Sequence, residues 1–274
     1  MKVAYQGIEG AYSEAALYRH FGKNVEAIGY DDFEDVFDSV KKGKVDYAVL
    51  PFENTIAGSV VRNYDLLIKD DVFVIGEVFL KISHNLLSNK GSSLKDIKKA
   101  YSHPHALEQC REFLQKHKIK PIPEYDTAGA AKLVKSRGKK EEAAIASELC
   151  AEIYNLSLLK KGIEANKSNT TKFFVIAKTQ NAPKDLKKEK TSIAFKTKHY
   201  PGALVNCLQR LSKNNINMTK LESRPVPENP WEYIFYVDFE GGIDNKKVKT
   251  ALSEMEASAS FIKVLGSYPA GKRD

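Results

Sequence analysis

The sequence has few of the features that mark membrane, secreted or metal-binding proteins. Its three cysteines, Cys110, Cys150 and Cys207, lie far apart and fit no metal-binding spacing. Each falls in a helix-like pattern, which predicts buried free thiols rather than disulfides. No stretch approaches the roughly 18 apolar residues that a membrane span needs, and the first residues form no apolar signal segment. We therefore expect a cytoplasmic protein without disulfides, bound metal or membrane contact.

Signatures of nucleotide and nucleic-acid binding are also missing. The segment Gly7–Gly10 lacks the three-glycine dinucleotide fingerprint, and the chain has no Walker A loop. The formal net charge is +8, but the lysines are dispersed and form no zinc-finger or RNA-recognition motif. Dispersed lysines are typical of solvated helix faces. These absences exclude a nucleic-acid partner and favour a small organic acid over a nucleotide as the ligand.

With 274 residues, of which 42% are apolar, the chain is long enough for two domains. Up to residue 178, short apolar runs typical of strands alternate with amphipathic helical segments, which predicts an α/β fold with mostly parallel strands. The expected strands are Lys2–Tyr5, Tyr47–Leu50 (ended by Pro51), Val72–Leu80 and Ala143–Ala146.

A polar, lysine-rich stretch at 179–190 predicts a linker. After it, the periodicity predicts the element order βαββαβ, which is that of ferredoxin-like folds. The expected strands are Thr191–Lys196, Met218–Arg224, Glu232–Glu240 and Phe261–Leu265, with helices around Leu204–Leu211 and Val248–Met255.

The stretch Asn169–Phe173 is the first candidate for a functional site. It places an amide, two hydroxyls and a cation at the start of the buried run Phe174–Ala177. Such groups can donate hydrogen bonds to an anion, although a polar strand start also occurs where a loop simply ends.

Polar motifs recur at junctions where a predicted strand is followed by a helix, and we expect these motifs to share one edge of a sheet. Ligands of α/β proteins bind at the carboxyl ends of parallel strands, where helix N-termini favour carboxylates or phosphates. Taken singly, each motif also fits an ordinary helix cap. Glu53 is equally compatible with an acid–base role and an ordinary loop carboxylate, and His103 and His105 with capping. The motifs are Gly7–Ser13, Pro51–Val60, Ser102–Ala106, Asp126–Ala130 and Ala146–Glu148.

Together these motifs resemble the prephenate dehydratase family over essentially the whole chain. Gly10–Ala16 resembles the family's opening signature, and Leu50–Val60 its ENS-x-x-GSV motif. Ser102–Leu107 resembles SHPQAL, Thr127–Ala131 the motif that follows, and Asn169–Phe173 the N-x-T-R-F motif. Gly202–Leu204 and Glu222–Pro225 are similar to the phenylalanine-binding motifs of ACT regulatory domains.

The resemblance implies an α/β fold with a two-lobed, periplasmic-binding-protein-like catalytic domain over 1–178 and a ferredoxin-like ACT domain over 191–274. The lobes would span roughly 1–78 with 158–178, and 79–157. No chorismate mutase segment precedes the first strand, which implies the monofunctional form.

The resemblance also implies roles for individual residues, and it implies no cofactor. Catalytic roles fall to Thr171, Glu53 and Asn54. Substrate binding falls to Ser13, Thr55, Ser59, His105, Thr127, Lys172 and Phe173. Allosteric binding of L-phenylalanine falls to Gly202, Ala203, Leu204, Asn217, Glu222, Ser223 and Arg224.

Three positions depart from the family pattern. Thr55 replaces serine, Lys172 replaces arginine and His105 replaces glutamine. Lysine keeps the positive charge but loses the fork that suits a carboxylate.

The implied activity is the decarboxylating dehydration of prephenate to phenylpyruvate in L-phenylalanine biosynthesis, with feedback inhibition by L-phenylalanine. The chain is expected to form a homo-oligomer, a dimer through ACT domains and then a tetramer. The nearest alternative is arogenate dehydratase, because Val61–Leu67 resembles the arogenate-using relatives. A non-catalytic amino-acid sensor is the alternative from another class, since two-lobed clefts also bind solutes.

Overall fold

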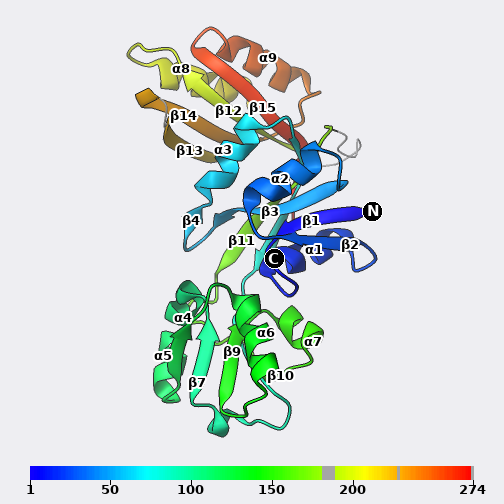
Figure 1. Cartoon of the computed structure of the whole chain (residues 1–274). Helices are drawn as coiled ribbons and strands as arrows, with labels where there is room; N and C mark the ends of the chain where they lie inside the picture. The colour runs from blue at the N-terminus through cyan, green and yellow to red at the C-terminus, as the bar shows by residue number, and fades with distance from the viewer. Residues whose placement is uncertain (181–188, 227–228, 273–274) are drawn as a thin grey trace.

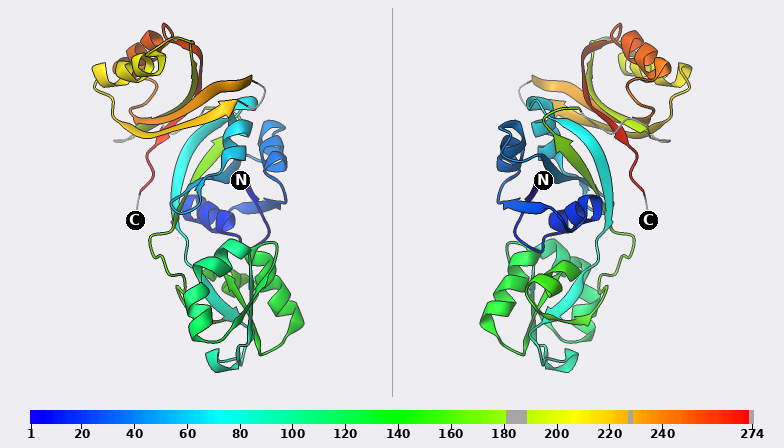
Figure 2. Two further views of the ribbon diagram at one scale, coloured as in Figure 1. Left: turned by 90° about the vertical axis from the view of Figure 1, so that its left-hand side faces the viewer. Right: turned by 90° about the vertical axis from the view of Figure 1, so that its right-hand side faces the viewer.

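The computed structural model describes residues 1–180, 189–226 and 229–272. Three β-sheets follow one another along the molecule, each with its own helices (Figures 1 and 2). The first lobe lies in the middle, the second lobe at one end and the C-terminal domain at the other. Residues 181–188 of the expected linker lie outside the described part of the chain.

The first lobe is a mixed sheet in the order β2-β1-β3-β11-β5, with β4 paired to β3. Strands β2, β1 and β3 are parallel, while β11 runs antiparallel between β3 and β5. The elements are β1 (Lys2–Gln6), α1 (Tyr12–Phe21), β2 (Glu26–Tyr30), α2 (Phe33–Lys41), β3 (Tyr47–Asn54), β4 (Gly58–Ser59), α3 (Val61–Lys69), β5 (Phe73–Lys81) and β11 (Thr170–Ala177).

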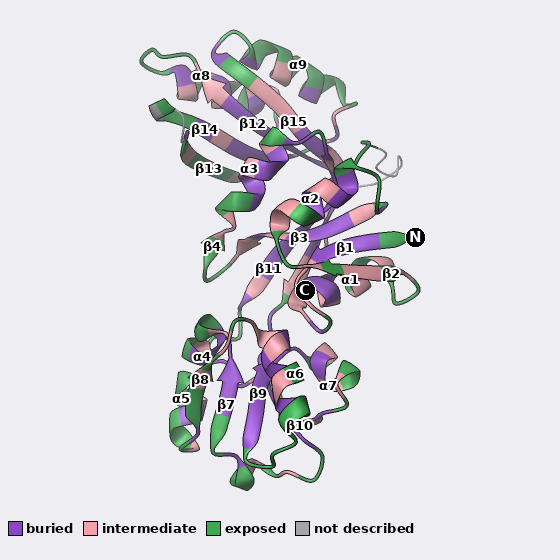
Figure 3. Ribbon diagram, viewed as in Figure 1, coloured by how far each residue is buried: buried purple, intermediate pink, exposed green. Residues whose placement is uncertain are grey.

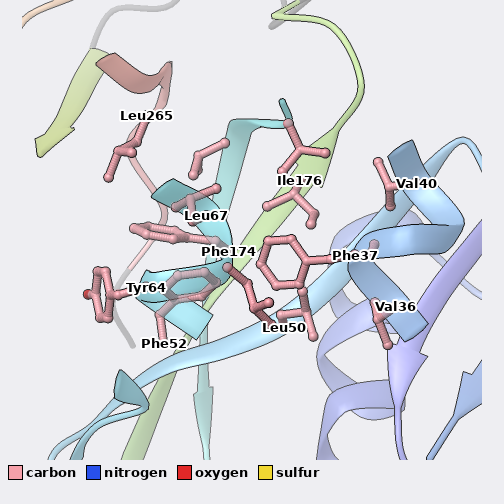
Figure 4. Packing of buried hydrophobic residues seen from close by; sticks show 14 of the residues in the cluster. Val36, Phe37, Val40, Leu50, Phe52, Tyr64, Leu67, Phe174, Ile176 and Leu265 are labelled. Carbon is pink, nitrogen blue, oxygen red and sulfur yellow. The ribbon is translucent and has the colours of Figure 1, made fainter. Parts of the chain in front are cut away.

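Alternation along β11 decides what each of its residues touches. Phe173 and Val175 pack with α1 on one face, in a cluster that includes Leu17. Phe174 and Ile176 pack on the opposite face with α2, α3 and the C-terminal domain, as Figure 4 shows. Two hydrophobic cores therefore sandwich this strand.

Pro51 does not end its strand, contrary to the expectation. Strand β3 continues to Asn54, and Pro51 lies opposite Phe173 beside a register shift in β11. The pairing of β3 with β1 stops at Val49, so the missing N–H of proline is tolerated there.

The second lobe has its own mixed sheet in the order β10-β6-β9-β7-β8. Strands β7, β8 and β9 are parallel, whereas β6 and β10 run antiparallel to their neighbours. The central strands β7 and β9 are largely buried (Figure 3). The elements are β6 (Asn85–Ser88), η1 (Leu94–Asp96), β7 (Lys99–Ser102), α4 (Pro104–Gln109), α5 (Arg111–Lys116), β8 (Lys120–Pro123), α6 (Thr127–Arg137), β9 (Glu142–Ala146), α7 (Glu148–Ile153) and β10 (Ser157–Lys160).

The lobe boundaries differ from those expected. Strand β5 continues to Lys81, so the first lobe extends past residue 78. Strand β10 pairs with β6, which places residues 158–160 in the second lobe rather than the first. The two lobes are therefore joined by the segments 82–84 and 161–169.

The C-terminal domain has the expected βαββαβ order and an antiparallel sheet ordered β13-β14-β12-β15, which is the ferredoxin-like arrangement. Helices α8 and α9 cover one face through Cys207, Leu211 and Met255. The elements are β12 (Glu189–Thr197), α8 (Ala203–Lys213), β13 (Met218–Val226), β14 (Asn229–Glu240), α9 (Lys246–Met255) and β15 (Ala259–Pro269). Because β12 begins at Glu189, the domain starts two residues before the expected 191.

The other face of this sheet rests on the first lobe. The rings of Tyr64 and Tyr236 lie 4.6 Å apart, and those of Phe174 and Tyr268 lie 5.6 Å apart. Strand β15 approaches β5 so closely that a Cβ at Gly266 would clash with the Val74 carbonyl oxygen. The C-terminal domain thus shares a hydrophobic core with the first lobe.

Candidate active site

A cleft of about 560 Å³ opens between the two lobes at their connecting segments. Most of the residues that line it have polar side chains, and none of the lining residues that the structure describes is a lysine or arginine. The lining residues are Tyr12, Ser13, Pro51, Asn54, Ile56, Ala57, Ile82, His84, His103, His105, Ala106, Gln109, Asp126, Thr127, Asn169, Thr171 and Phe173.

Two helices from opposite lobes begin at this cleft. Helix α1 begins at Tyr12 and presents Ser13, while α6 begins at Thr127. Asp126 caps α6 by accepting a hydrogen bond from the Gly129 N–H at 2.7 Å, and Gly138 ends the helix with a left-handed φ of 66°. Helix N-termini carry partial positive charge, so the cleft can hold anions without a basic side chain.

Asn54 and Thr171 meet where β3 and β11 reach the cleft. The Asn54 amide Nδ2 donates to Thr171 Oγ1 at 2.8 Å, and Asn54 Oδ1 accepts from the backbone N–H groups of Ile56 and Ala57 at 2.9 and 2.8 Å. The Thr171 side chain is buried but reaches the cleft lining. The structure therefore brings these two expected residues together.

Glu53 and Lys172, also expected in the site, point to the other side of the sheet. They are register partners next to the pair Asn54 and Thr171, and neighbouring strand residues face opposite ways. Lys172 Nζ lies 2.7 Å from Asp238 Oδ2 and 3.6 Å from Glu53 Oε2. The expectations that Glu53 acts on substrate and that Lys172 binds it are wrong for this arrangement.

The electrostatics of this pair fit a structural role. Burial alone would lower the pKa of Lys172, but Asp238 and Glu53 outweigh it and raise the pKa. Burial alone would raise the pKa of Asp238, but Lys172 and Lys190 hold it below its usual range. Burial likewise works against the charge on Glu53, yet Lys172 and Lys220 lower the pKa of that carboxyl. All three groups are held in their charged forms.

Thr55 and Ser59 also lie away from the cleft. The Ser59 hydroxyl donates to Glu222 and accepts from Lys220 Nζ at 3.2 Å, both in the C-terminal domain. Thr55 Oγ1 accepts from the Thr170 N–H at 3.0 Å and donates to the Ser168 carbonyl. These two substrate-binding expectations are not supported, because both hydroxyls serve contacts behind the cleft.

Ser13, His105, Thr127 and Phe173 are in the cleft as expected. His105 belongs to α4, and its ring stacks on that of His103 with centroids 5.3 Å apart. Burial lowers the pKa of His103, and the neighbouring His105 lowers it further. Phe173 is almost fully buried and forms an apolar part of the wall.

Six polar cleft residues were missing from the expected site: Tyr12, His84, His103, Gln109, Asp126 and Asn169. His103 and Asp126 lie within the motifs Ser102–Ala106 and Asp126–Ala130. Tyr12 and Asn169 lie within motifs that the sequence already singled out, and Gln109 lies one helical turn beyond His105 on α4. His84 lies in the lobe connection and belongs to none of the motifs, so only its polarity between two apolar strands could have marked it.

A second cavity, of about 580 Å³, lies between the first lobe and the C-terminal domain. Glu53, Lys172, Lys220 and Asp238 line it, and Lys220 Nζ lies 2.8 Å from Glu222. The stretch of β11 that lines this cavity with one face lines the interlobe cleft with its other face.

The residues expected to bind L-phenylalanine fall into separate places in one protomer. Gly202, Ala203 and Leu204 begin α8, whereas Asn217 follows its far end, about 16 Å away along a helix of 11 residues. Glu222 and Arg224 contact the first lobe, through Ser59 and through Asp65 and the Val61 carbonyl. Ser223, between them on β13, is exposed.

Within the described part of the chain, no group of three potential metal-ligating side chains comes together. The same residues contain no helix that is long and apolar enough to cross a membrane. Cys110, Cys150 and Cys207 are free and buried, as expected.

Two α/β lobes joined by two connecting segments, with a cleft between them lined by polar side chains, are typical of domains that bind a ligand between their lobes. The family model for prephenate dehydratase matches residues 3–181, and the chain belongs to that family. It is 40% identical to an arogenate dehydratase/prephenate dehydratase of Arabidopsis thaliana, over 98% of this chain and 73% of that protein. It is 38% identical to a bifunctional chorismate mutase/prephenate dehydratase of Aquifex aeolicus, over 98% and 74%.

Comparison with solved structures agrees with this family assignment. A prephenate dehydratase from Arthrobacter aurescens in complex with L-Phe aligns with a TM-score of 0.88 at 27% identity, over 98% of this chain and 90% of the other. A structure described as GqqA, a novel type of quorum quenching acylase, aligns with a TM-score of 0.90 at 32% identity, over 98% of both chains. The fold extends over the whole chain in both comparisons.

Proposed function

We propose that this protein catalyses the decarboxylating dehydration of prephenate to phenylpyruvate. The observation that supports it best is the pair Asn54 and Thr171 in a cleft whose walls carry helix N-termini from both lobes. Family membership and the names of the relatives point to the same reaction.

The substrate is a dicarboxylate, and the cleft offers an anion-binding helix start on each lobe. Helix α1 with Ser13 and helix α6 with Thr127 would each hold one carboxylate. A substrate bridging the two would also draw the lobes together, which excludes water from the reacting centre.

The chemistry needs little from the protein beyond position and one hydrogen-bond donor. The bond between the ring and its carboxylate breaks, and that electron pair enters the ring as carbon dioxide leaves. The ring C–O bond breaks with its pair on oxygen, which takes one proton and leaves as water. The Thr171 hydroxyl would donate a hydrogen bond to that oxygen, and Asn54 would hold the hydroxyl in orientation.

The first experiment is turnover of prephenate by the purified full chain, with phenylpyruvate followed by its absorbance. Arogenate should be assayed beside it, with L-phenylalanine as the product. Product formation from either substrate supports the reaction class, and the ratio of the two kcat/KM values identifies the preferred substrate. No turnover of either compound would contradict the proposal.

Arogenate remains the nearest alternative substrate because several relatives carry both activities in their names. The segment Val61–Leu67, which suggested arogenate, forms most of α3. That helix packs on the C-terminal domain through Tyr64 and does not line the cleft, so it makes no direct contact with the group that distinguishes the two substrates.

Acylase activity, named for one relative, is the second candidate. A hydroxyl that attacks an amide needs a base within hydrogen-bond reach. Thr171 Oγ1 instead receives a hydrogen bond from the Asn54 amide, which cannot accept a proton. We therefore expect amide hydrolysis to be undetectable under conditions where prephenate turns over.

The C-terminal domain is proposed to be an ACT domain that binds L-phenylalanine and inhibits the enzyme. Its element order and a related prephenate dehydratase solved with L-Phe support this. Because Gly202–Leu204 and Glu222–Arg224 are separate in one protomer, the effector site would be completed by a second copy of the chain, which gives a dimer or a tetramer built from two such dimers. Calorimetric L-phenylalanine binding without any loss of turnover would refute the inhibition.

A cytoplasmic location also stays a proposal. It is best checked by cell fractionation with an antibody to the chain.

A further inference from the structure

A continuous chain of side-chain hydrogen bonds crosses the cleft from one lobe to the other. Asn54 Nδ2 donates to Asn169 Oδ1 at 2.7 Å, and Asn169 Nδ2 donates to Gln109 Oε1 at 2.9 Å. Gln109 Oε1 lies 3.0 Å from His84 Nε2, and His84 Nδ1 lies 2.9 Å from the Tyr12 hydroxyl. Asn54 belongs to the first lobe, Gln109 to the second, and His84 and Asn169 to the two connections.

The direction of these bonds follows from two backbone groups. The N–H groups of Ile56 and Ala57 can only donate, so the Asn54 atom facing them is the oxygen. The Asn54 NH₂ then has two hydrogens for its two near acceptors, Asn169 Oδ1 and Thr171 Oγ1, while the Thr170 carbonyl oxygen lies farther away at 3.5 Å.

The same argument fixes the direction of the next hydrogen bonds in the series, as far as His84. Asn169 presents its oxygen to Asn54 and therefore its NH₂ to Gln109, whose oxygen must accept. That oxygen also faces His84 Nε2, so Nε2 must carry a hydrogen. A neutral ring then has a bare Nδ1, and the single hydrogen of the Tyr12 hydroxyl is shared between two acceptors, His84 Nδ1 at 2.9 Å and the Ser83 carbonyl oxygen at 2.8 Å.

The surroundings of His84 favour this neutral ring. Burial lowers the pKa of His84, against smaller opposing effects of the Gln109 contact and of Glu164, whose carboxylate accepts from the His84 backbone N–H at 2.9 Å. Tyr12 and Glu164 are the titratable groups that face the residue. Burial also raises the pKa of Tyr12, so both members of the pair are uncharged near neutral pH.

We propose that His84, as the neutral tautomer with hydrogen on Nε2, is a positioning residue: its N–H holds Gln109 Oε1, and through Gln109 and Asn169 it supports the Asn54 orientation that the Ile56 and Ala57 N–H groups impose. Thr171 Oγ1 ends that chain as an acceptor, so its own hydrogen is left to point at the substrate. Among the described residues, Thr171 Oγ1 makes no other hydrogen bond. The tautomer is independent of the reaction, whereas the catalytic consequence rests on the proposed function.

The tautomer can be measured without substrate. In ¹⁵N-histidine-labelled protein at pH 7, the His84 ring signals are assigned by their loss in His84→Gln. We expect a one-bond N–H coupling at Nε2 and none at Nδ1. A hydrogen on Nδ1, alone or together with Nε2, would overturn the assignment.

The positioning role is tested by two substitutions at the same site. Glutamine can place an N–H close to the position of Nε2, whereas leucine cannot donate. We expect His84→Gln to keep kcat within about threefold, and His84→Leu to lose about 10- to 100-fold in kcat with little change in KM, because a misplaced donor affects the chemical step more than binding.

His199→Gln is the matched control, since His199 is exposed in the C-terminal domain, and it should keep wild-type kinetics. Wild-type kcat in His84→Leu would overturn the role. So would equal losses in folded His84→Gln and His84→Leu. Absence of turnover in the wild-type chain would instead refute the proposed function and leave the tautomer measurement unaffected.

Discussion

The two faces of strand β11 have different partners, although the residues that define them are neighbours. Thr171 lies on the face toward the interlobe cleft and contacts Asn54. Lys172 lies on the opposite face, here called the back face, and contacts Asp238 of the C-terminal domain. A strand is stiff along its length, so displacement of one face displaces the other. The comparison indicates that Lys172, next to the proposed donor Thr171, belongs to the contact between the first lobe and the C-terminal domain.

Each face also has its own electrostatic character. The described cleft lining lacks lysine and arginine and relies on helix starts and neutral donors. The back face holds lysines and carboxylates in close pairs, including Lys190 with Glu77 at 2.8 Å. A hydrogen-bonded cleft without basic side chains suits a step in which charge moves within the substrate, whereas buried ion pairs fix the position of two domains.

The largest effect is expected from removing the hydroxyl on the cleft face. Thr171→Val keeps the shape but deletes the donor, so kcat should fall by about 10²- to 10⁴-fold. Thr171→Ser is the control and should retain most of the activity. Steady-state kinetics on the preferred substrate measures both, and a valine variant with near wild-type kcat would show that another group donates to the leaving oxygen.

Removing the charge on the back face should affect stability rather than chemistry. Lys172→Met leaves Asp238 buried without its closest cation, which should cost about 3–5 kcal/mol in the free energy of unfolding.

The double variant Lys172→Met with Asp238→Leu is the control, and its cost should be well below the sum of the two single variants. Urea unfolding of the four proteins measures the coupling. Additive costs would mean that the two side chains do not interact.

Allosteric inhibition should weaken when the back-face contact is lost. If L-phenylalanine acts through the C-terminal domain, the Lys172→Met/Asp238→Leu protein should show about tenfold less inhibition, within the usual range of coupling energies. L-phenylalanine binding, followed by calorimetry, should persist. Undiminished inhibition would show that the coupling between effector binding and activity does not depend on the contact between Lys172 and Asp238.

The smallest effect is a dependence of stability on pH. Burial lowers the pKa of His84 and of His20 in the folded protein, so the unfolded chain binds protons first as the pH falls below about 6.5. Stability should therefore decline between pH 7 and pH 5. A further decline should follow below about pH 4, where Asp238, whose pKa is also lowered, would be protonated in the unfolded chain.

His84→Gln should reduce only the first decline. Thermal unfolding across this pH series is the measurement. A melting temperature that rises on acidification would contradict the assigned directions.

Much of the fold follows from periodicity in the sequence. The alternation in Tyr233–Phe239 and the helix face of Leu204–Leu211 predicted the elements of the C-terminal domain correctly, because Phe235, Val237 and Phe239 pack with that helix face in one core. The opposite face of the strand is also buried, against the first lobe, and the alternation did not predict this. The expected end of β3 at Pro51 was wrong, because the proline lies where β1 no longer pairs. The assignment of β10 to the first lobe was wrong because strand pairing between distant segments leaves no local signal.

The site was predictable in part. Motif spacing identified Ser13, Asn54, Thr127 and Thr171, which the folded chain brings to one cleft. Strand alternation could have shown that Thr171 and Lys172 face opposite ways, but motif reasoning treated them as one unit. His84 could not be found in this manner, since its role depends on partners 25 and 72 residues away along the chain.

The most direct test of the central claim is the KM of the Lys172→Met/Asp238→Leu protein for the preferred substrate, measured without effector and well below the melting temperature. The two-face account predicts a KM within about threefold of the wild-type value, because neither side chain touches substrate. A KM raised by a hundredfold or more, equivalent to roughly 2.7 kcal/mol of lost binding, would place Lys172 at the substrate and contradict the account.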